Sequence, residues 1–438
     1  MTRCICGVRA GALALALGLG LGLTLGAWSP GRAHARDLFE SDDGEFRLTL
    51  RSSFKGSWLL TFPQDDPLLD DQVGGSALFR LRFELGARLT EYLSSQIAYE
   101  HRALATSSAG LGAAVLPAAS APAFRLTALD WVVVDGAPNF VHRHEIDRAY
   151  LSLHLPFMEL TVGRQAIGLG RGQLFSAIDM FAPFAPAEVD REWRRGVDAV
   201  HLELRVPGLS ALSADFFAVF GNIDSGELQT WSMLGRVRAV VGDVDGELVV
   251  GRRGDDNMVG GALSATIGDA EFHGELSLFG TDGRGVDGGL FGTRGVVAKG
   301  VLGGSYMIDI WRGLRVVLEY HYSGFGIENV SQDASILSDP MFQMRLSRGD
   351  TQTQGRHTLA LVLSTELADE LSAAIAYYQS PVDGSGMVAP AMTWIASDIL
   401  TMVLNVLLPW GTAPEGGVPR SEWGSAPFTI FLQARVYD

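Results

Sequence analysis

The chain has 438 residues and a formal net charge of −16, and 47% of its residues are hydrophobic. This acidic balance excludes a nucleic-acid-binding protein, because contacts with phosphates require a basic surface. The two cysteines, Cys4 and Cys6, both lie at the N-terminus, so the rest of the sequence offers no disulfide and no thiolate metal site.

Residues 1–35 have the pattern of a secretory signal peptide. A basic start with two arginines precedes residues 11–26, which contain only Ala, Leu, Gly and one Thr, and Ala33-His34-Ala35 offers a small-residue cleavage site. We therefore predict a cleaved signal peptide over residues 1–35 and one mature domain over residues 36–438. A retained membrane anchor is the alternative. Removal of the three arginines of the signal peptide makes the net charge of the mature chain −19.

After residue 35 the apolar residues recur with a period of two. From Phe46 to Arg51, and again from Phe79 to Leu85, apolar and polar residues alternate, and arginines occupy several of the polar positions. Successive side chains of a strand point to opposite faces, so this pattern predicts strands with one apolar and one polar face. No run of about 18 apolar residues follows residue 35, so no transmembrane helix is expected.

The alternating segments run for about ten residues, the length of a tilted membrane-spanning strand, whereas strands of soluble proteins usually have about five to six. Short turns alternate with long connections, which is typical of outer-membrane barrels. We expect an all-β fold, a transmembrane antiparallel β-barrel of eighteen strands, with sixteen as the alternative. An even count requires a break at Ala396-Ser397-Asp398, inside what would otherwise be one long strand. The expected strands cover residues 46–60, 77–89, 93–103, 143–155, 158–166, 196–206, 211–221, 229–241, 246–253, 257–267, 270–280, 295–308, 314–324, 356–367, 370–380, 387–396, 398–409 and 427–437.

Basic residues occupy the polar positions of the first three expected strands. They are Arg47, Arg51, Lys55, Arg80, Arg82, Arg88 and Arg102. Only Glu84 and Glu100 accompany them, so one interpretation is a positive lumen wall that attracts anions. The other interpretation is a ladder of arginine–carboxylate pairs that only braces the barrel, because later strands carry inward acids such as Glu275. The sequence leaves both interpretations open.

The connection over residues 167–195 is rich in glycine and contains four aromatic residues. Its glycines do not form a dinucleotide site, because no βαβ pattern surrounds them. Exposure of these aromatic side chains to water would be unfavourable, so we expect the segment to fold into the lumen as a constriction. Arg171, Arg194 and Arg195 are its candidate solute-binding residues. The alternative is an extracellular cap that packs on itself.

The middle of the chain resembles the alginate-export and phosphate-selective porin families. The resemblance rests on Asp147 to Leu153, on Leu160 to Gln165 with its Gly-Arg-Gln ending, and on Arg195 to Val200, and it covers about sixty residues. It implies an outer-membrane channel and matches Arg148, Arg164 and Asp198 to the families' pattern, so Arg148 and Arg164 join the candidate lumen and solute-binding residues.

Catalytic and metal motifs are missing from the sequence. His142 and His144 lie near one expected strand end, other histidines such as His101 are isolated in sequence, and no G-x-S-x-G or H-E-x-x-H motif occurs. We therefore expect no enzyme, no cofactor and no metal site, because a histidine pair alone is weak evidence for a metal ligand.

The resulting prediction is a passive, porin-like channel in the outer membrane of a Gram-negative bacterium for small polar solutes, with anions as the candidate preferred class. Expected partners are outer-membrane lipid, the solute and the barrel-assembly machinery, whose signals usually end in an aromatic residue; here Asp438 follows Tyr437. A monomer and a trimer both remain open. Rival hypotheses are a closed barrel that serves as an adhesion or structural scaffold, and an outer-membrane hydrolase.

Overall fold

The computed structural model describes residues 36–62, 73–107, 124–137, 139–181, 183–184, 188, 190–206, 208–221, 231–254, 256–281, 295–416 and 418–438. The predicted signal peptide over residues 1–35 lies outside these ranges, as do most of the connections predicted at 61–76 and 281–294. Among the described residues, no helix combines the length and the hydropathy needed to span a bilayer.

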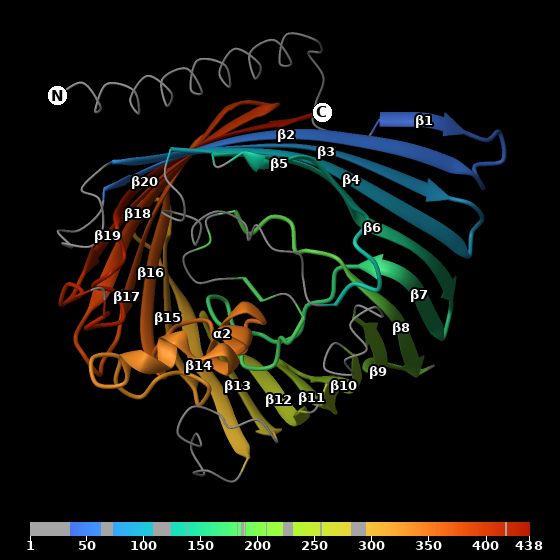
Figure 1. Cartoon of the computed structure of the whole chain (residues 1–438). Helices are drawn as coiled ribbons and strands as arrows, with labels where there is room; N and C mark the ends of the chain where they lie inside the picture. The colour runs from blue at the N-terminus through green and yellow to red at the C-terminus, as the bar shows by residue number, and fades with distance from the viewer. Residues whose placement is uncertain are drawn as a thin grey trace.

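Eighteen antiparallel strands form one closed barrel, in which β2 pairs with both β3 and β20 (Figure 1). This confirms the predicted fold class and decides for eighteen strands over sixteen. The break near Ser397 is a short turn between β18 and β19, which pair with each other. The barrel strands are β2 (Arg47–Phe62), β3 (Gly74–Arg88), β4 (Leu93–Thr106), β6 (Phe140–Leu155), β7 (Met158–Gln165), β8 (Val197–Val206), β9 (Leu209–Phe220), β10 (Ser232–Val241), β11 (Val244–Arg253), β12 (Asp256–Ile267), β13 (Ala270–Gly280), β14 (Val296–Ile308), β15 (Leu314–Ser323), β16 (His357–Ala368), β17 (Leu371–Gln379), β18 (Gly386–Ser397), β19 (Leu400–Trp410) and β20 (Phe428–Tyr437).

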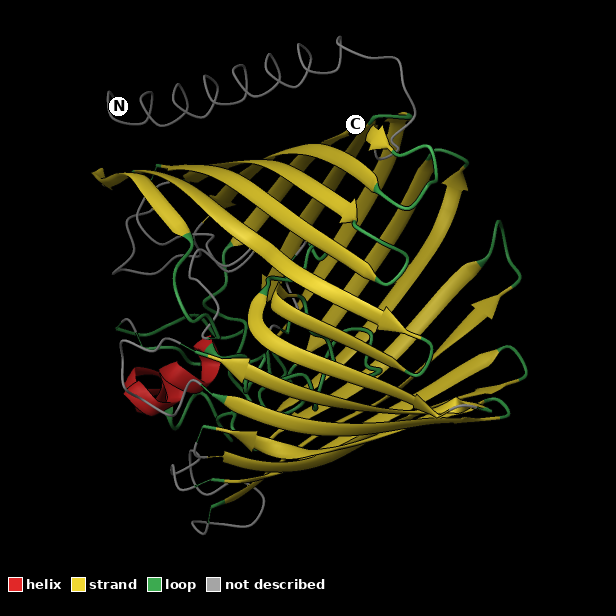
Figure 2. Ribbon diagram, turned by 90° about the vertical axis from the view of Figure 1, so that its right-hand side faces the viewer, coloured by secondary structure: helices red, strands yellow, loops and turns green. Residues whose placement is uncertain are grey.

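Among the described residues, two additional strands and two short helices lie outside the predicted set. β1 (Arg36–Glu40) pairs with the start of β2, and β5 (Asp130–Ala137) pairs with residues 140–145 of β6. β7 is short, and within β6 it pairs only with residues 149–155. β5 pairs with the part of β6 that lies beyond the end of β7. The helices η4 (Ala334–Ser338) and α2 (Pro340–Ser347) lie in the connection between β15 and β16. Figure 2 shows α2 among the long connections at one end of the barrel and the short turns at the other.

The strands present apolar side chains outward and polar side chains inward. On three neighbouring strands Leu263, Leu276 and Leu302 are 61%, 58% and 69% exposed, whereas the adjacent Glu275 is 4% exposed. Because side chains alternate along a strand, this is the surface expected of a barrel in contact with lipid around a polar interior.

The two faces of β12 predict different responses to a new charge. We expect Leu263→Arg to destabilise the barrel by about 2–4 kcal/mol, the cost of an arginine facing lipid near mid-bilayer. The neighbouring Ser264→Arg should cost much less, since residue 264 shares the inward face with Ala262 and lies beside Asp245 in the register with β11. Urea titration of refolding into lipid vesicles measures both. Equal losses would contradict the assignment of the faces.

Candidate functional site

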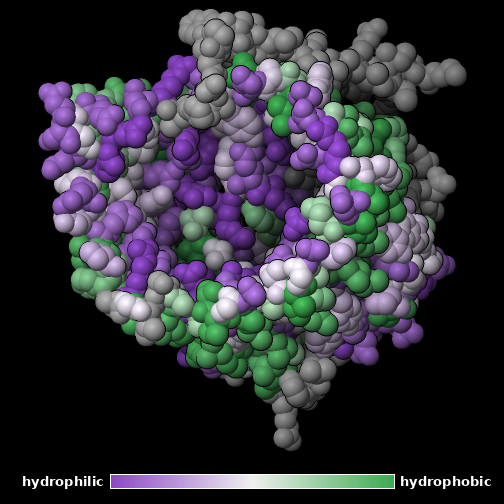
Figure 3. All heavy atoms as spheres, turned by 180° about the vertical axis from the view of Figure 1, so that it is seen from behind, coloured by the Kyte–Doolittle hydropathy of each residue, from purple (hydrophilic) through white to green (hydrophobic). Residues whose placement is uncertain are grey.

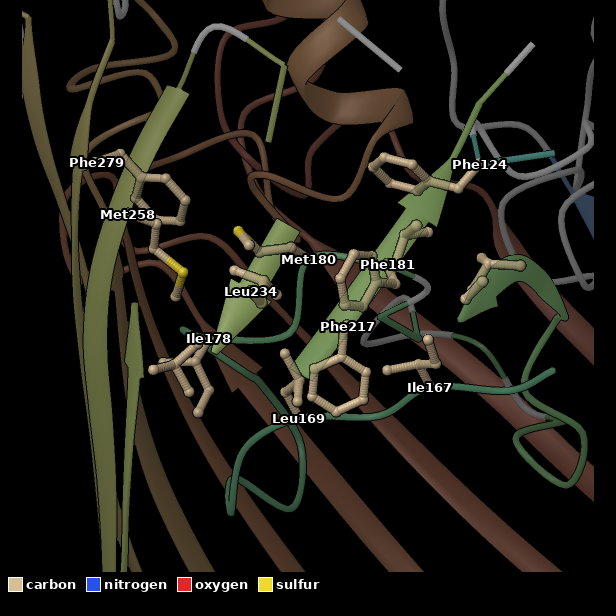
Figure 4. Packing of buried hydrophobic residues seen from close by; sticks show 14 of the residues in the cluster. Phe124, Ile167, Leu169, Ile178, Met180, Phe181, Phe217, Leu234, Met258 and Phe279 are labelled. Atoms are coloured by element: carbon tan, nitrogen blue, oxygen red, sulfur yellow. The ribbon is translucent and has the colours of Figure 1, made fainter. Parts of the chain in front are cut away.

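Part of the lumen is filled by the described residues of the segment 166–196, which lies between β7 and β8. Its Ile167, Leu169, Ile178 and Phe181 are buried and form an apolar cluster with inward residues of the wall, among them Phe217 (Figure 4). In Figure 1 the segment runs in green inside the ring of strands. The segment therefore lies in the lumen, as expected, and not outside as a cap packed on itself.

A carboxylate on β13 holds the backbone of this segment. Glu275 accepts hydrogen bonds from the backbone N–H groups of Gly172 and Ala177, both at 2.6 Å, and of Ile178 at 3.2 Å. It also accepts the hydroxyl of Ser176 at 3.0 Å. A buried segment without regular secondary structure must find partners for its backbone N–H groups, and an ionised carboxylate is a strong acceptor for several of them.

Inward carboxylates on β11 and β15, the next strands but one on either side of β13, bind the segment in the same way. Glu319 on β15 accepts the backbone N–H groups of Gln173, Leu174 and Phe175 at 2.6, 3.0 and 3.1 Å. Glu247 on β11 accepts that of Gly170 at 3.0 Å. Carboxylates on three alternate strands thus fix nearly the whole stretch from residue 170 to residue 178.

The glycines of the segment are required by this close approach. Gly170 has φ +96°, and a Cβ there would lie 2.4 Å from Oε1 of Glu275. A Cβ at Gly172 would lie 1.9 Å from the carbonyl oxygen of Phe175. The Gly-Leu-Gly-Arg-Gly sequence therefore serves a tight turn around a carboxylate, since only glycine accepts such contacts and a positive φ at no steric cost.

Removing the central carboxylate should release the segment. We expect Glu275→Ala to accelerate proteolysis within residues 168–180 and to raise single-channel conductance and its fluctuations, because several backbone N–H groups lose their acceptor. Glu275→Gln, which keeps one acceptor oxygen, should be intermediate. Glu271→Ala is the matched control, since Glu271 lies on the same strand and contacts Ser305 instead of the segment. Proteolysis of Glu275→Ala at the parent rate would refute the anchoring role.

The opposite wall carries a lateral row of basic side chains. In the strand register, Lys55 lies directly beside Arg435 on one side and Arg80 on the other, and Arg80 lies beside Arg102. Like charges directly opposite each other are destabilising. Glu100 offsets this repulsion: it lies 2.9 Å from Arg80 and hydrogen-bonds Arg102.

The inserted segment supplies further partners for this row. Asp190 lies 2.7 Å from Nζ of Lys55 and 3.0 Å from Arg80, and the Trp193 ring centroid lies 3.7 Å from the same Nζ. Burial opposes ionisation of Asp190, but Lys55 and Arg80 outweigh it and hold the pKa of this carboxyl below its ordinary value. The segment is therefore joined to both walls by charge, with carboxylates on one side and cations on the other.

A second row of ion pairs lies behind the first on β6. Arg82 lies 2.9 Å from Asp147, and Arg125 lies 2.6 Å from Glu145. Both carboxylates face the lumen, and Asp147 is the extra residue at the register shift in the pairing of β4 with β6. Asp147 also accepts the backbone N–H of Gly196 at 3.1 Å, which ties the end of the inserted segment to this row.

Within the described residues, these ion pairs join into one network with an excess of two positive charges. Its basic members are Arg51, Lys55, Arg80, Arg82, Arg102, Arg125, Arg148 and Arg435, and its acidic members are Glu84, Glu100, Glu145, Asp147, Asp190 and Glu192. Arg195 lies near Arg102 and Glu145. Burial and the charge of Arg102 lower its pKa to about 10, so it remains cationic at neutral pH.

The other predicted site residues also have partners in the structure. Arg47 pairs with Asp37 at 2.6 Å, and Arg88 donates to the carbonyl of Gly44 at 2.9 Å, both near the short turns. Arg171 pairs with Asp245 at 2.6 Å, and Arg194 pairs with Asp179.

The two arginines matched by the resemblance both make structural contacts. Arg148 donates to the carbonyl of Arg194 at 2.8 Å. Arg164 is buried, pairs with Asp198 at 2.8 and 3.0 Å, and donates to the carbonyl of Ile146. These bonds connect β6, β7 and β8 at the point where the inserted segment leaves and rejoins the wall.

Sequence reasoning missed several members of the network. Arg435 follows from the alternation of β20 once the barrel closes against β2. Asp190, Trp193 and Arg125 lie on irregular connections, where no period marks the inward face. Only the tertiary contacts bring them to the basic row.

Seen from the short-turn side, the molecule is hollowed at its centre, and hydrophilic residues line the hollow (Figure 3). A closed barrel with an apolar outer face, a hydrophilic interior and an inserted segment has the architecture of an outer-membrane β-barrel of the porin type.

Comparison with solved structures supports this class. Acinetobacter baumannii OccAB4 superposes with a TM-score of 0.54 at 10% identity, over 91% of this chain and 100% of that one. Pseudomonas aeruginosa OccK9 (OpdG) gives 0.53 at 10% identity, over 89% and 98%. A. baumannii OccAB1 gives 0.53 at 8% identity, over 93% and 99%. These neighbours are outer-membrane porins, and at such low identity the similarity establishes a shared fold. No protein-family model and no curated protein sequence matches the chain.

Proposed function

We propose that this barrel is a passive channel for small polar solutes and that it favours anions. The observation that carries the proposal is the charge of the lumen network, in which eight basic side chains meet six acidic ones among the described residues. A positive wall in a confined lumen raises the local concentration of anions, and at physiological salt it acts over about 8–10 Å.

The inward acids on β9, β13 and β15 have partners of their own. Glu275 and Glu319 are buried and directed into the backbone N–H groups of the inserted segment. Asp215 is fully buried and lies 2.9 Å from His201 and 3.0 Å from Arg236. Backbone N–H groups, His201 and Arg236 partly offset the charge of these carboxylates, which supports a lumen in which the basic wall sets the preference.

Reversal potential under a salt gradient in planar bilayers tests the preference. We expect the parent channel to be anion-selective. The double variant Arg51→Ser/Arg88→Ser should show a weaker anion selectivity, because these two side chains are exposed near the short-turn end of the basic wall. Buried members such as Arg80 are left intact, since their removal would strand Glu100 and Asp190 and cost about 3–5 kcal/mol.

Arg312→Ser is the matched control, since Arg312 lies on a short turn and pairs with Asp369. A cation-selective parent, or a double variant with the parent's reversal potential, would overturn the anion preference. Absence of any conductance would overturn the channel itself and favour the closed scaffold.

The resemblance to the alginate-export and phosphate-selective porin families suggests which anions to test. Arg148, Arg164 and Asp198, the matched residues, brace the root of the inserted segment. We propose the solute class of one of those families for this chain, and the basic wall supports this proposal. Reduction of the chloride current by added phosphate would favour a phosphate-selective channel, and reduction by uronate oligomers would favour an alginate-export channel.

We also propose that residues 1–35 are a cleaved signal peptide, that the barrel-assembly machinery inserts the mature chain, and that the long connections face the cell exterior. An epitope at the exposed Ser338 should be labelled on intact cells, and one at Gly208, in the short turn between β8 and β9, should not. Labelling of Gly208 alone would mean an inverted barrel, and an unprocessed N-terminus on the purified protein would contradict cleavage.

A further inference from the structure

Three histidines that are distant in sequence meet on the outer wall of the barrel. His101 lies on β4, His142 and His144 lie on β6, and the register places His101 directly beside His144 (Figure 1 shows the two strands side by side). His101 shares its strand face with Ile97, which is 48% exposed, whereas Glu100 and Arg102 on the other face are buried in the lumen. The cluster therefore faces outward.

The three imidazoles are close enough to share one ion. Nε2 of His142 lies 2.6 Å from Nε2 of His101, and the ring centroids of the three residues lie 4.5 to 5.0 Å apart. One nitrogen of each ring lies within 4.8 Å of the other two. Three ligands at the zinc–nitrogen distance of about 2.0–2.1 Å would stand roughly 3.3 Å apart in a tetrahedral site, so shifts on the order of 1 Å complete the geometry.

The neighbours of the cluster on the outward face, as far as their side chains are described, are apolar or aromatic. The outward neighbours are Leu81 and Phe83 on β3, Tyr99 on β4, Ile146 on β6 and Trp131 on β5. Glu100 and Glu145, which pair with each other one position along the register from His101 and His144, point to the lumen side. Polar groups on the lipid side of a barrel are costly, so three adjacent imidazoles there need an explanation.

Tyr99 completes the arrangement. Its hydroxyl forms a hydrogen bond with Nδ1 of His144, which leaves Nε2 of that ring available. Metal-binding histidines commonly use their second nitrogen for such a bond, because it fixes the ring and its tautomer. Neutral imidazoles prefer zinc-like transition metals over calcium or magnesium.

We propose that His101, His142 and His144 bind one divalent transition-metal ion of the zinc class on the outer wall of the barrel, with the fourth position open to water. The ion would join β4 and β6, the two strands that flank the long connection over residues 107–139. This inference is independent of the channel proposal, since the site faces away from the lumen.

Zinc binding by the complete barrel tests the proposal. The protein, prepared without a histidine tag, treated with a chelator and refolded in detergent, should bind one zinc per chain in equilibrium dialysis with elemental analysis. We expect His142→Asn to weaken binding by more than about tenfold, because loss of even an outer-shell partner commonly costs about 10–100-fold. Zinc should also raise the thermal unfolding temperature of the parent and leave that of the variant unchanged.

His357→Asn is the matched control. His357 also lies at the start of a strand with an outward tyrosine partner, its Nδ1 being 2.6 Å from the hydroxyl of Tyr320, and it belongs to no three-ligand group among the described residues. This variant should bind zinc like the parent. A parent that binds no zinc, or a His142→Asn protein that binds as tightly as the parent, would overturn the proposal.

The cobalt spectrum of the parent decides the matter if the histidine variants fail to fold. Cobalt bound by three imidazoles and water should give the intense visible absorption of tetrahedral coordination. A weak spectrum typical of octahedral cobalt, or none, would overturn the site without the need for a variant.

Discussion

The lumen depends on one interaction, the capture of backbone N–H groups by inward carboxylates. Residues 170–178 have no regular secondary structure and are held by Glu247, Glu275 and Glu319 from three alternate strands of the wall. A buried N–H without a partner costs about 1–3 kcal/mol, so this set of acceptors decides whether an irregular segment can occupy a barrel at all. The wall therefore supplies the acceptors that the segment needs, and the segment supplies the donors for the buried carboxylates of the wall.

This arrangement also separates the charges of the lumen. On β11, β13 and β15 the carboxylates accept the backbone N–H groups of the segment. On the basic wall, Asp190 of the same segment joins Lys55 and Arg80. The two interpretations of the basic wall, selectivity and bracing, are thus compatible in physical terms. Buried arginines such as Arg80 brace the barrel through paired carboxylates, and the proposed anion preference rests on the cations that remain in excess.

The outer face obeys a different constraint. Lipid contact favours apolar side chains, and the exposed leucines of β12, β13 and β14 conform to it. The His101–His142–His144 cluster departs from it at a place where the sequence offers no motif, because the three residues belong to two strands separated by a long connection. The proposed ion would account for this departure, because all three imidazoles would bind it.

The sequence by itself determined the barrel. The period of two, the strand lengths and the alternation of short and long connections located all eighteen barrel strands, because lipid on one side and water on the other impose a repeating demand on every strand. The inward phase of Arg47 to Arg102 followed from the same rule. Strands β1 and β5 lay outside this rule, since β1 is only five residues long and β5 belongs to a connection.

Only the tertiary structure decided which charges meet. Asp190 and Trp193 reach Lys55 from the inserted segment, Arg125 reaches Glu145 from another connection, and Arg435 reaches the basic row through closure of β20 on β2. Irregular segments carry no periodic signal, and contacts between residues far apart in sequence depend on strand register. The outward histidine cluster has the same origin, since the pairing of β4 with β6 places His101 beside His144.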